Sequence, residues 1–253
     1  MTGGETVFRM IPFRYFPAAM NMAIDEAILD GLKEGTSPPT IRFYGWEPSA
    51  VSIGRFQGLE YEVNLEACRQ AGVDVVRRIT GGGAVYHDRD GEVTYSILGP
   101  AGLFPERIPD SYRAICDDVV AALQLLDIPA EFAPINDIMV EGRKISGNAQ
   151  TRRSRLFLQH GTVLYQVDVE KMFSLLSVSP EKVSDKLIRS VKKRVTSVSE
   201  FRQIPMSALA DAMQAAFSRS RPVEQGDYLP KELERAHQLA REKYGTMEWN
   251  AMR

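Results

Sequence analysis

Three consecutive glycines, Gly81–Gly83, are followed by a segment that favours a β-strand rather than a helix. They lie in the stretch VVRRITGGGAVYHD, residues 75–88. The common phosphate-binding loops, G-x-x-x-x-G-K-[ST] and G-x-G-x-x-G, both open a helix, and neither pattern is present here. A ligand bound by these glycines would therefore lie on the face of a sheet, held by backbone N–H groups that form an anion-binding nest. A flexible hairpin turn is the alternative interpretation.

Short β-prone segments adjoin one another in the first two thirds of the chain, without a regular strand–helix–strand alternation. We expect strands at 40–46, 50–54, 73–78, 84–87, 92–98 and 155–165, and a hairpin at 136–147 that turns at Glu141–Gly142. We expect helices at 21–35, capped by Asn21 and ended by Gly35, at 64–72, capped by Asn64, and at 110–128. This order predicts an α/β (α+β) chain with a mixed β-sheet flanked by helices. It also predicts one domain over residues 1–253, with a sheet-rich core at about 1–168 and a helical tail at about 169–253.

The composition is that of an ordinary globular chain: 253 residues, 44% hydrophobic, 25% charged, with a formal net charge of −2. A chain so close to neutrality has no global field that attracts nucleic acid, so we expect no nucleic-acid partner. No N-terminal segment resembles a signal peptide, and no run reaches the ~18 apolar residues of a membrane span. We therefore expect a cytoplasmic protein without membrane attachment. Cys68 and Cys116 share no metal or redox spacing and are expected to be reduced thiols in helices.

A second candidate region, NDIMVEGRKISGNAQ, spans residues 136–150. Strand alternation places Lys144 on the same face as Ser146. A lysine facing a pocket can balance the negative charge that accumulates when a carboxylate condenses with a phosphate, although a solvated lysine after a tight turn has the same sequence. Asn136 and Asp137 can form a turn, or they can hold a ligand and Mg²⁺.

Two histidines accompany the β-prone motifs. His87 ends the stretch that contains the glycines, and His160 lies in LQHGTVLY, residues 158–165. A lone histidine near a strand is commonly structural. The two become candidates for a binding site because each belongs to one of the motifs, and His160 is followed by Gly161.

In these motifs the chain resembles the catalytic domain of lipoate-protein ligases, within the biotin/lipoate protein ligase superfamily, and especially the large subunit of bipartite lipoate-protein ligases. The matching segments are RRITGGGAVYHD, NDIMVEGRKISGNAQ and QHGTVLY, with PTIRFYGWEPSAVSIGRFQ upstream and KYGTMEWN near the end. The resemblance implies a mixed sheet related to class II aminoacyl-tRNA synthetase cores. It also implies two reaction steps. Lipoate and ATP, with Mg²⁺, would form lipoyl-AMP, and a lysine of a lipoyl-domain acceptor (an E2 subunit or a glycine-cleavage H-type protein) would then receive the lipoyl group.

The resemblance also implies roles for particular residues. Lys144 would be the catalytic residue, with its ammonium bridging the acyl carbonyl and the phosphate. Arg78 would bind phosphate, and Asn136 and Asp137 would serve the nucleotide, Asp137 also holding Mg²⁺. The backbone of the glycine segment would bind the adenylate: Gly81, Gly82, Gly83, Ala84, Val85 and Tyr86. The lipoyl pocket would be lined by Arg77, His87 and His160, and Val51, Ile53 and Leu158 are candidates for its apolar tunnel.

Two alternatives remain open. Octanoyltransferases of the same fold move an acyl group from an acyl carrier protein without ATP, through a cysteine or by direct attack. In the cysteine-dependent kind the cysteine precedes the segment equivalent to EGRK, where this chain has IPAEFAPINDIMV, residues 128–140, without a cysteine. That difference favours the ATP-using ligase. The other alternative is a non-catalytic module that binds an acyl-adenylate or acts through a basic surface. The residues of that surface would be Arg152, Arg153, Arg155, Lys182, Lys186, Arg189, Lys192, Lys193 and Arg194.

Longer lipoate-protein ligases carry an additional C-terminal domain after the catalytic one. The sequence stops at Arg253, soon after the KYGTMEWN segment. The resemblance therefore implies either that a small accessory protein replaces the missing domain, which is the favoured alternative, or that this chain acts alone. In the enzymatic interpretation, the basic residues would attract an acidic lipoyl domain.

Overall fold

The computed structural model describes residues 6–177 and 190–252 and is built around an eight-stranded mixed sheet. The strand order is β11-β1-β2-β6-β10-β9-β8-β7, in which β1 pairs parallel with β11 and β2 and all other neighbours are antiparallel. In chain order these strands are β1 (Phe8–Phe16), β2 (Thr40–Trp46), β6 (Glu92–Pro100), β7 (Ala130–Ala133), β8 (Asp137–Val140), β9 (Arg143–Arg153), β10 (Leu156–Leu164) and β11 (Val223–Gln225). The predicted mixed sheet flanked by helices is confirmed.

A second, three-stranded sheet has the order β4-β3-β5. Its strands are β3 (Ala50–Ile53), β4 (Asp74–Arg77) and β5 (Val85–His87). Because β4 and β5 lie on opposite sides of β3, the segment between them, residues 78–84, crosses over the end of β3. A Cβ on Gly54, directly after β3, would lie 2.1 Å from the carbonyl oxygen of Gly82. Glycine at position 54 therefore allows the glycine segment to cross.

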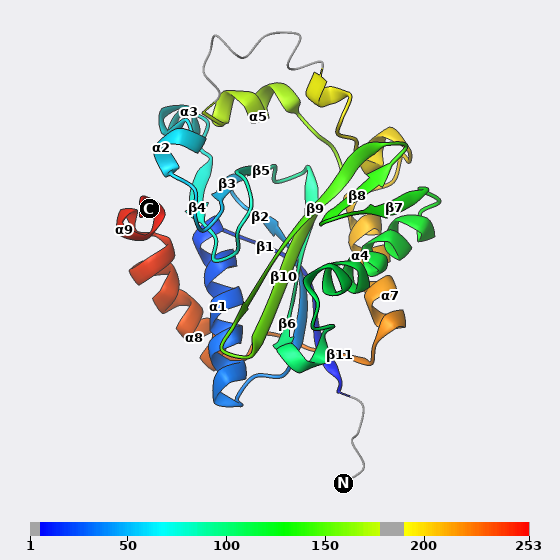
Figure 1. Ribbon diagram of the computed structural model, residues 1–253. Coiled ribbons are helices and arrows are strands. Elements are labelled where there is room, and N and C mark those ends of the chain that lie inside the picture. The colour runs from blue at the N-terminus through cyan, green and yellow to red at the C-terminus, as the bar shows by residue number, and fades with distance from the viewer. Residues whose placement is uncertain (1–5, 178–189, 253) are drawn as a thin grey trace.

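Helices cover both faces of the large sheet, with α4 and α7 on one side and α1 and α8 on the other (Figure 1). Each pair of helices encloses an apolar cluster against the sheet. The helices are α1 (Ala18–Glu34), α2 (Leu59–Glu62), α3 (Leu65–Gln70), α4 (Ile108–Leu125), α5 (Val169–Leu175), α7 (Met206–Ser220), α8 (Pro230–Leu239) and α9 (Met247–Asn250). Short turns of other helix types are η1 (Ala101–Leu103), η2 (Val198–Glu200) and η3 (Ala240–Tyr244). Within the described residues, no helix is both long and apolar enough to cross a membrane.

The first helix begins earlier than its sequence predicts. α1 starts at Ala18 with Pro17 as its N-cap residue, so the expectation that Asn21 caps the helix is wrong. Asn21 is instead fully buried, and its amide group donates hydrogen bonds to two backbone carbonyls. The predicted end of the helix is confirmed, because Gly35 adopts a left-handed conformation with φ 73° at the C-cap.

Three other local predictions are confirmed. The helix expected at 110–128 is α4, and its buried apolar residues pack into the cluster between this helix and the sheet. The side chain of Asn64 accepts the N–H of Ala67 and so caps α3. The hairpin of β8 and β9 turns at Glu141 and Gly142, whose φ angles of 51° and 73° are both positive, as a type I′ turn requires.

Two strands at one edge of the large sheet lie outside the predicted elements. β1 contains Pro12, and its register with β2 shifts between Ile11 and Arg14. β11 has only three residues and lies in the region that was expected to be helical. Neither segment has an uninterrupted alternation of polar and apolar residues, which is the main signal of a strand in a sequence.

Candidate active site

A cavity of about 330 Å³ is lined by residues of both sheets. The lining residues also come from α1, the glycine segment, α5 and the chain on either side of α5. They are Met22, Tyr44, Trp46, Ser52, Arg78, Gly82, Gly83, Ala84, Val85, Tyr86, His87, Thr94, Asn136, Lys144, Ser146, Gly147, Asn148, Ala149, His160, Gly161, Thr162, Leu164, Val167, Met172 and Val195. The cavity therefore brings together all three motifs that the sequence analysis selected.

The register of the large sheet explains why side chains from four strands share this face. Tyr44 of β2 pairs with Thr94 of β6, Thr94 pairs with Thr162 of β10, and Thr162 pairs with Gly147 of β9. Residues that are paired across neighbouring strands point to the same side of a sheet. This row of residues forms the floor of the cavity and leads to the strand that carries Lys144.

Lys144 lines the cavity at the start of β9. Its backbone N–H and C=O bond to Arg194 and Thr196, so a segment after α5 fixes the position of the residue. Its Nζ lies 2.7 Å from Asp137 Oδ1 on the neighbouring strand β8. A Cβ on Gly147 would lie 2.9 Å from this Nζ, so glycine at that position gives the lysine its path along the cavity. Lys144 thus supplies a positive charge to the cavity.

Asn136 lines the cavity, whereas the side chain of Asp137 faces Lys144 and is not part of the lining. Asn136 and Asn148 are joined reciprocally, because each side-chain amide donates to the backbone carbonyl of the other residue. No group of three or more His, Cys, Asp or Glu side chains suited to a metal ion occurs among the described residues. Asp137 was expected to hold Mg²⁺, but it is a single carboxylate that already pairs with Lys144. One carboxylate in an ion pair is a poor set of donors for this ion.

The glycine segment presents backbone N–H groups to the cavity. Gly82, Gly83 and Ala84 belong to the lining, but Gly81 does not. No described residue accepts a hydrogen bond from the N–H groups of these three lining residues. Their arrangement suits an anion or a carbonyl oxygen that gains negative charge.

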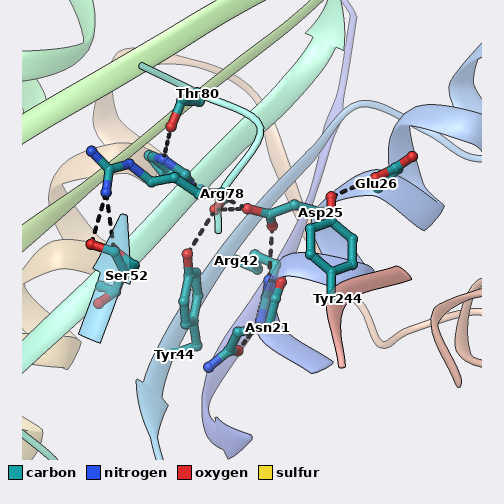
Figure 2. Close-up of polar contacts among 12 residues, drawn as sticks. Asn21, Asp25, Glu26, Arg42, Tyr44, Ser52, Arg78, Thr80 and Tyr244 are labelled. Atoms are coloured by element: carbon teal, nitrogen blue, oxygen red, sulfur yellow. Dashed lines mark hydrogen bonds and ion pairs between the residues drawn. The ribbon is translucent and has the colours of Figure 1, made fainter. Parts of the chain in front are cut away.

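Arg78 shapes this segment from within. Its Nη2 donates to the carbonyl oxygens of Gly81 and Gly83, at 2.9 and 2.7 Å, and its Nη1 donates to the hydroxyl and carbonyl of Ser52. Figure 2 shows the Arg78 side chain directed at Ser52. Burial lowers the pKa of Arg78 to about 10, so the group remains charged at neutral pH. Arg78 was expected to bind phosphate, but most of the donors of its guanidinium group already bond to the protein itself.

Arg77 does not line the cavity, contrary to the expectation that it belongs to the acyl pocket. Consecutive strand residues point to opposite faces, and Arg77 points away from the cavity. Its buried guanidinium donates to five backbone carbonyls, those of Gly54, Arg55, Gln57, Trp249 and Asn250. Arg77 therefore fastens the last helix, α9, to the edge of the small sheet.

His160 lines the cavity and connects it to a buried ion pair. Its Nε2 bonds to the hydroxyl of Thr80, at 2.7 Å, and its Nδ1 lies 3.5 Å from Asp25 Oδ2. Asp25 is also bonded to Arg42 and Ser96. Burial alone would raise the pKa of Asp25, but the Arg42 charge and the contact with His160 outweigh it, and the pKa lies below its ordinary value.

His87 lines the cavity beside the glycine segment and is fixed on three sides. Its ring stacks on Trp46, with 4.0 Å between ring centroids. Its Nδ1 bonds to Glu92 Oε1 at 2.6 Å, and its Nε2 bonds to the Ser52 hydroxyl at 2.8 Å. Both histidines proposed from the sequence therefore reach the same cavity.

These motifs and this geometry agree with one protein family. The family model described as the lipoyl protein ligase A/B catalytic domain matches residues 17–218. The chain belongs to this family.

Curated relatives of this lipoyl protein ligase A/B family member match nearly its whole length. Octanoyltransferase LipM of Geobacillus kaustophilus (strain HTA426) is 37% identical, over 98% of this chain and 99% of its own. Octanoyltransferase LipM of Anoxybacillus flavithermus (strain DSM 21510 / WK1) is 36% identical with the same coverage. Among solved structures, a bipartite lipoate protein ligase from Thermoplasma acidophilum superposes with a TM-score of 0.87 at 30% identity, over 98% of both chains. A lipoate-protein ligase A bound with ATP has a TM-score of 0.82 at 29% identity, over 98% of this chain and 99% of its own.

These relatives correct the function expected from the sequence. The chain was expected to be an ATP-dependent lipoate ligase, but its full-length curated relatives are octanoyltransferases, so that expectation is wrong. The ligase was favoured because residues 128–140 contain no cysteine. An acyl donor that is already activated can react with an amine directly, so the lack of a cysteine does not require ATP. The accessory protein expected for adenylate formation belonged to the same interpretation and is not carried forward.

Neither cysteine of this family member belongs to the cavity. Cys68 and Cys116 are both buried. Burial raises the pKa of Cys68 to about 11 and that of Cys116 to about 12, so both remain protonated thiols at neutral pH. Neither is suited to act as a nucleophile.

The apolar wall of the cavity is not the one suggested by the sequence. Val51, Ile53 and Leu158 are fully buried in the apolar clusters and do not line the cavity. The apolar lining includes Met22 and Trp46 instead. Trp46 lies within the segment PTIRFYGWEPSAVSIGRFQ that carried the resemblance, so a signal for it existed.

The basic residues proposed as one docking surface divide into groups. Lys182, Lys186 and Arg189 lie outside the described residues. Arg152, Arg153 and Arg155 lie around the turn between β9 and β10, whereas Lys192, Lys193 and Arg194 lie next to Lys144 at the other end of β9. At about 3.3 Å per residue, the nine residue-to-residue steps from Lys144 to Arg153 span roughly 30 Å. The described basic residues therefore do not form a single continuous surface.

Proposed function

We propose that this enzyme transfers an octanoyl group from the thioester of an acyl carrier to the ε-amine of a lysine on a lipoyl-domain protein, without ATP. The octanoyltransferase relatives support the acyl group and the class of reaction. The observation that carries the proposal is that Lys144 lines the same cavity as the N–H groups of Gly82 and Gly83.

The cavity suits the chemistry of direct acyl transfer. When the ε-amine of the acceptor protein's lysine attacks the carbonyl carbon of the thioester, a C–N bond forms and negative charge develops on the carbonyl oxygen. The Lys144 ammonium and the glycine N–H groups stabilise that charge. Collapse of the intermediate breaks the C–S bond, and the proton lost by the amine goes to the departing thiolate. No oxidant, reductant or nucleotide is needed, because the thioester is already activated.

The size and wall of the cavity suit a medium-length acyl chain. Its volume of about 330 Å³ is near the lower end of the range of about 300–1,000 Å³ found for small-molecule sites. Met22, Trp46 and Leu164 offer apolar contacts. Thr94 and Thr162 of the sheet floor lie on the two strands between Trp46 on β2 and Lys144 on β9. The acyl chain would bind in the cavity while both protein partners remain outside.

The decisive experiment mixes the purified protein with an octanoyl-loaded acyl carrier protein and an apo lipoyl domain, and follows the mass of the acceptor. We expect an octanoyl increment on the acceptor without ATP. A parallel reaction contains free octanoate, ATP and Mg²⁺ in place of the loaded carrier. Modification only in that second reaction, or in neither, overturns the proposal.

Direct attack makes a separate prediction about the thiols. The double variant Cys68→Ala/Cys116→Ala should retain kcat within about twofold of the wild type. Incubating the wild type with the loaded carrier alone should leave its mass unchanged, since no acyl-enzyme forms. An octanoyl adduct on either cysteine, or a large loss of rate in the double variant, would show a covalent route instead.

A further inference from the structure

The curvature of the glycine segment depends on one buried side chain. Arg78 draws the carbonyl oxygens of Gly81 and Gly83 toward a single nitrogen, Nη2. Between them Gly82 adopts φ 103°, and a Cβ on Gly82 would lie 2.8 Å from that nitrogen. With the two carbonyls held on the arginine, the neighbouring N–H groups are left for the cavity. The position of the Arg78 guanidinium therefore sets the position of the N–H groups.

A continuous chain of hydrogen bonds leads from Arg78 to a carboxylate. Arg78 Nη1 lies 3.1 Å from the Ser52 hydroxyl, which lies 2.8 Å from His87 Nε2, and His87 Nδ1 lies 2.6 Å from Glu92 Oε1. All four side chains are buried. Arginine can only donate, so the Ser52 oxygen accepts from it and the Ser52 proton is free to go to His87 Nε2. His87 then carries its proton on Nδ1 and donates to Glu92, and every donor points the same way.

The two ends of this chain carry opposite charges. Among the described residues, no carboxylate forms an ion pair with Arg78, and Glu92 is the carboxylate at the end of its hydrogen-bond chain. Glu92 Oε1 also accepts from Thr94, while Glu92 Oε2 is buried without a partner in the described part of the protein. A buried carboxylate with an unpartnered oxygen costs folding free energy. Glu92 does not line the cavity. Because burying this carboxylate costs stability, an effect of Glu92 on the site explains its position better than a contribution to folding does.

We propose that Glu92 is a positioning residue for acyl transfer, which acts through His87, Ser52 and Arg78 to hold the N–H groups of the glycine segment against the acyl carbonyl. Glu92 fixes the tautomer and orientation of His87, and the stacked Trp46 keeps the ring in its plane. His87 orients the Ser52 hydroxyl, and Ser52 holds one arm of the arginine fork. The kinetic effect of Glu92 rests on the proposed acyl transfer, whereas its effect on the glycine segment does not.

The test compares Glu92→Gln with a matched control, Asp118→Asn. Glutamine keeps the size of the side chain but removes its charge and allows its amide to donate. Asp118 is also a buried carboxylate, and it is bonded to Arg221 away from the cavity. For Glu92→Gln we expect kcat to fall on the order of 10-fold with little change in KM for the acyl donor, because the N–H groups act mainly in the transition state. Asp118→Asn should leave both constants near the wild-type values.

Amide hydrogen exchange followed by mass spectrometry supplies a readout that does not need activity. The amides to follow are those of Arg55 and Arg78, which donate to the carbonyls of Thr80 and Ile53 and so hold the glycine segment to the end of β3. In Glu92→Gln, peptides that contain these two amides should exchange faster than in the wild type, while peptides from α4 and β10 should be unchanged. Wild-type exchange and kcat in Glu92→Gln would overturn the proposal. Faster exchange throughout the protein, seen also in Asp118→Asn, would equally overturn it, because a general loss of stability would then explain the result. If the wild type transfers no acyl group, the proposed function fails, and exchange at the amides of Arg55 and Arg78 alone decides whether Glu92 holds the segment.

A double variant tests whether the residues act as one chain. Ser52→Ala interrupts the chain between Arg78 and His87. If Glu92 acts only through Ser52, the amides of Arg55 and Arg78 should exchange no faster in the double variant Glu92→Gln/Ser52→Ala than in the Ser52→Ala single variant. Additive effects would mean that Glu92 acts by another route and would overturn the proposed chain.

Discussion

The two faces of the central strands carry opposite kinds of side chain. On the face covered by α4 and α7, alternate residues of β2 and β6 join an apolar cluster: Ile41, Phe43, Val93, Tyr95 and Ile97. On the face toward α1 and the cavity, the intervening residues are mainly polar: Arg42, Tyr44, Glu92, Thr94 and Ser96. Both faces are buried, so the contrast is not between a core and a solvated surface.

The difference shows how stability and chemistry are separated within one sheet. Buried apolar side chains stabilise the fold without precise partners. Buried polar side chains cost free energy unless each is hydrogen-bonded, and here they bond to one another, as Arg42 does to Asp25 and Asn21. The polar face therefore serves to position the groups of the site, while the apolar face of the same strands stabilises the fold by packing against α4 and α7.

The largest effect in this comparison is expected on the apolar face. Phe43 packs edge-on against Phe217 of α7, with 5.6 Å between ring centroids. Phe43→Ala should lower the free energy of unfolding by about 3–5 kcal/mol, because a cavity remains in the cluster. Its kcat, measured at a temperature where the variant is folded, should stay within about twofold of the wild type. Urea denaturation and initial rates provide the two measurements.

Tyr44→Phe is the control for Phe43→Ala, because Tyr44 is the next residue of β2 and lies on the face toward α1 and the cavity. It keeps the ring and removes only the hydroxyl that is hydrogen-bonded to Ser96. The expected cost in stability is about 1 kcal/mol. If Phe43→Ala lost activity without losing stability, the proposed division between the two faces would be wrong.

The next effect is expected at Lys144. Lys144→Ala should reduce kcat by about 10²-fold, which is typical of removing one group that stabilises charge in the transition state. Stability should change by less than about 1 kcal/mol, because the ion pair with Asp137 is partly exposed and screened by water. Lys192→Ala serves as the control, since Lys192 is an exposed lysine that pairs with Glu170. Turnover near the wild-type level in Lys144→Ala would remove this residue from the mechanism.

Much of the site was visible in the sequence because its residues stand in short motifs. Lys144, Asn136, His87 and His160 all line the cavity, and so do five of the six residues from Gly81 to Tyr86. The mixed sheet followed from β-prone segments without a regular helix between them. In each case the signal was local, contained in a glycine run, a turn or an alternation.

The remaining parts of the site depend on contacts between distant segments. Glu92 and Asp25 become functional candidates only when the packing of the small sheet and of α1 against the large sheet places them beside His87 and His160. Their sequence signals were weak: Asp25 is a polar residue on the apolar side of a helix, four positions after Asn21. Arg77 was assigned to the cavity with Arg78, although neighbours in a strand point to opposite faces. Because side chains alternate between the two faces of a strand, only one of Arg77 and Arg78 could have been expected to face the cavity.

The smallest effect is expected from the titration of His160. Burial lowers the pKa of His160 below its ordinary value of 6.5, although Asp25 acts in the opposite direction, and the charge of Arg78 lowers it further. Below pH 6.5 the unfolded chain takes up a proton at this residue that the folded protein resists, so the free energy of unfolding should fall as the pH falls from 6.5 toward the folded pKa. One such group contributes a slope of at most about 1.4 kcal/mol per pH unit, and His160→Gln should remove that contribution. Asp25 does not interfere, because its lowered pKa affects stability only below about pH 4. Urea unfolding at several pH values between 5.5 and 7.5 measures both slopes, and an equal slope in the wild type and the variant would mean that His160 is not held neutral by the polar face of the sheet.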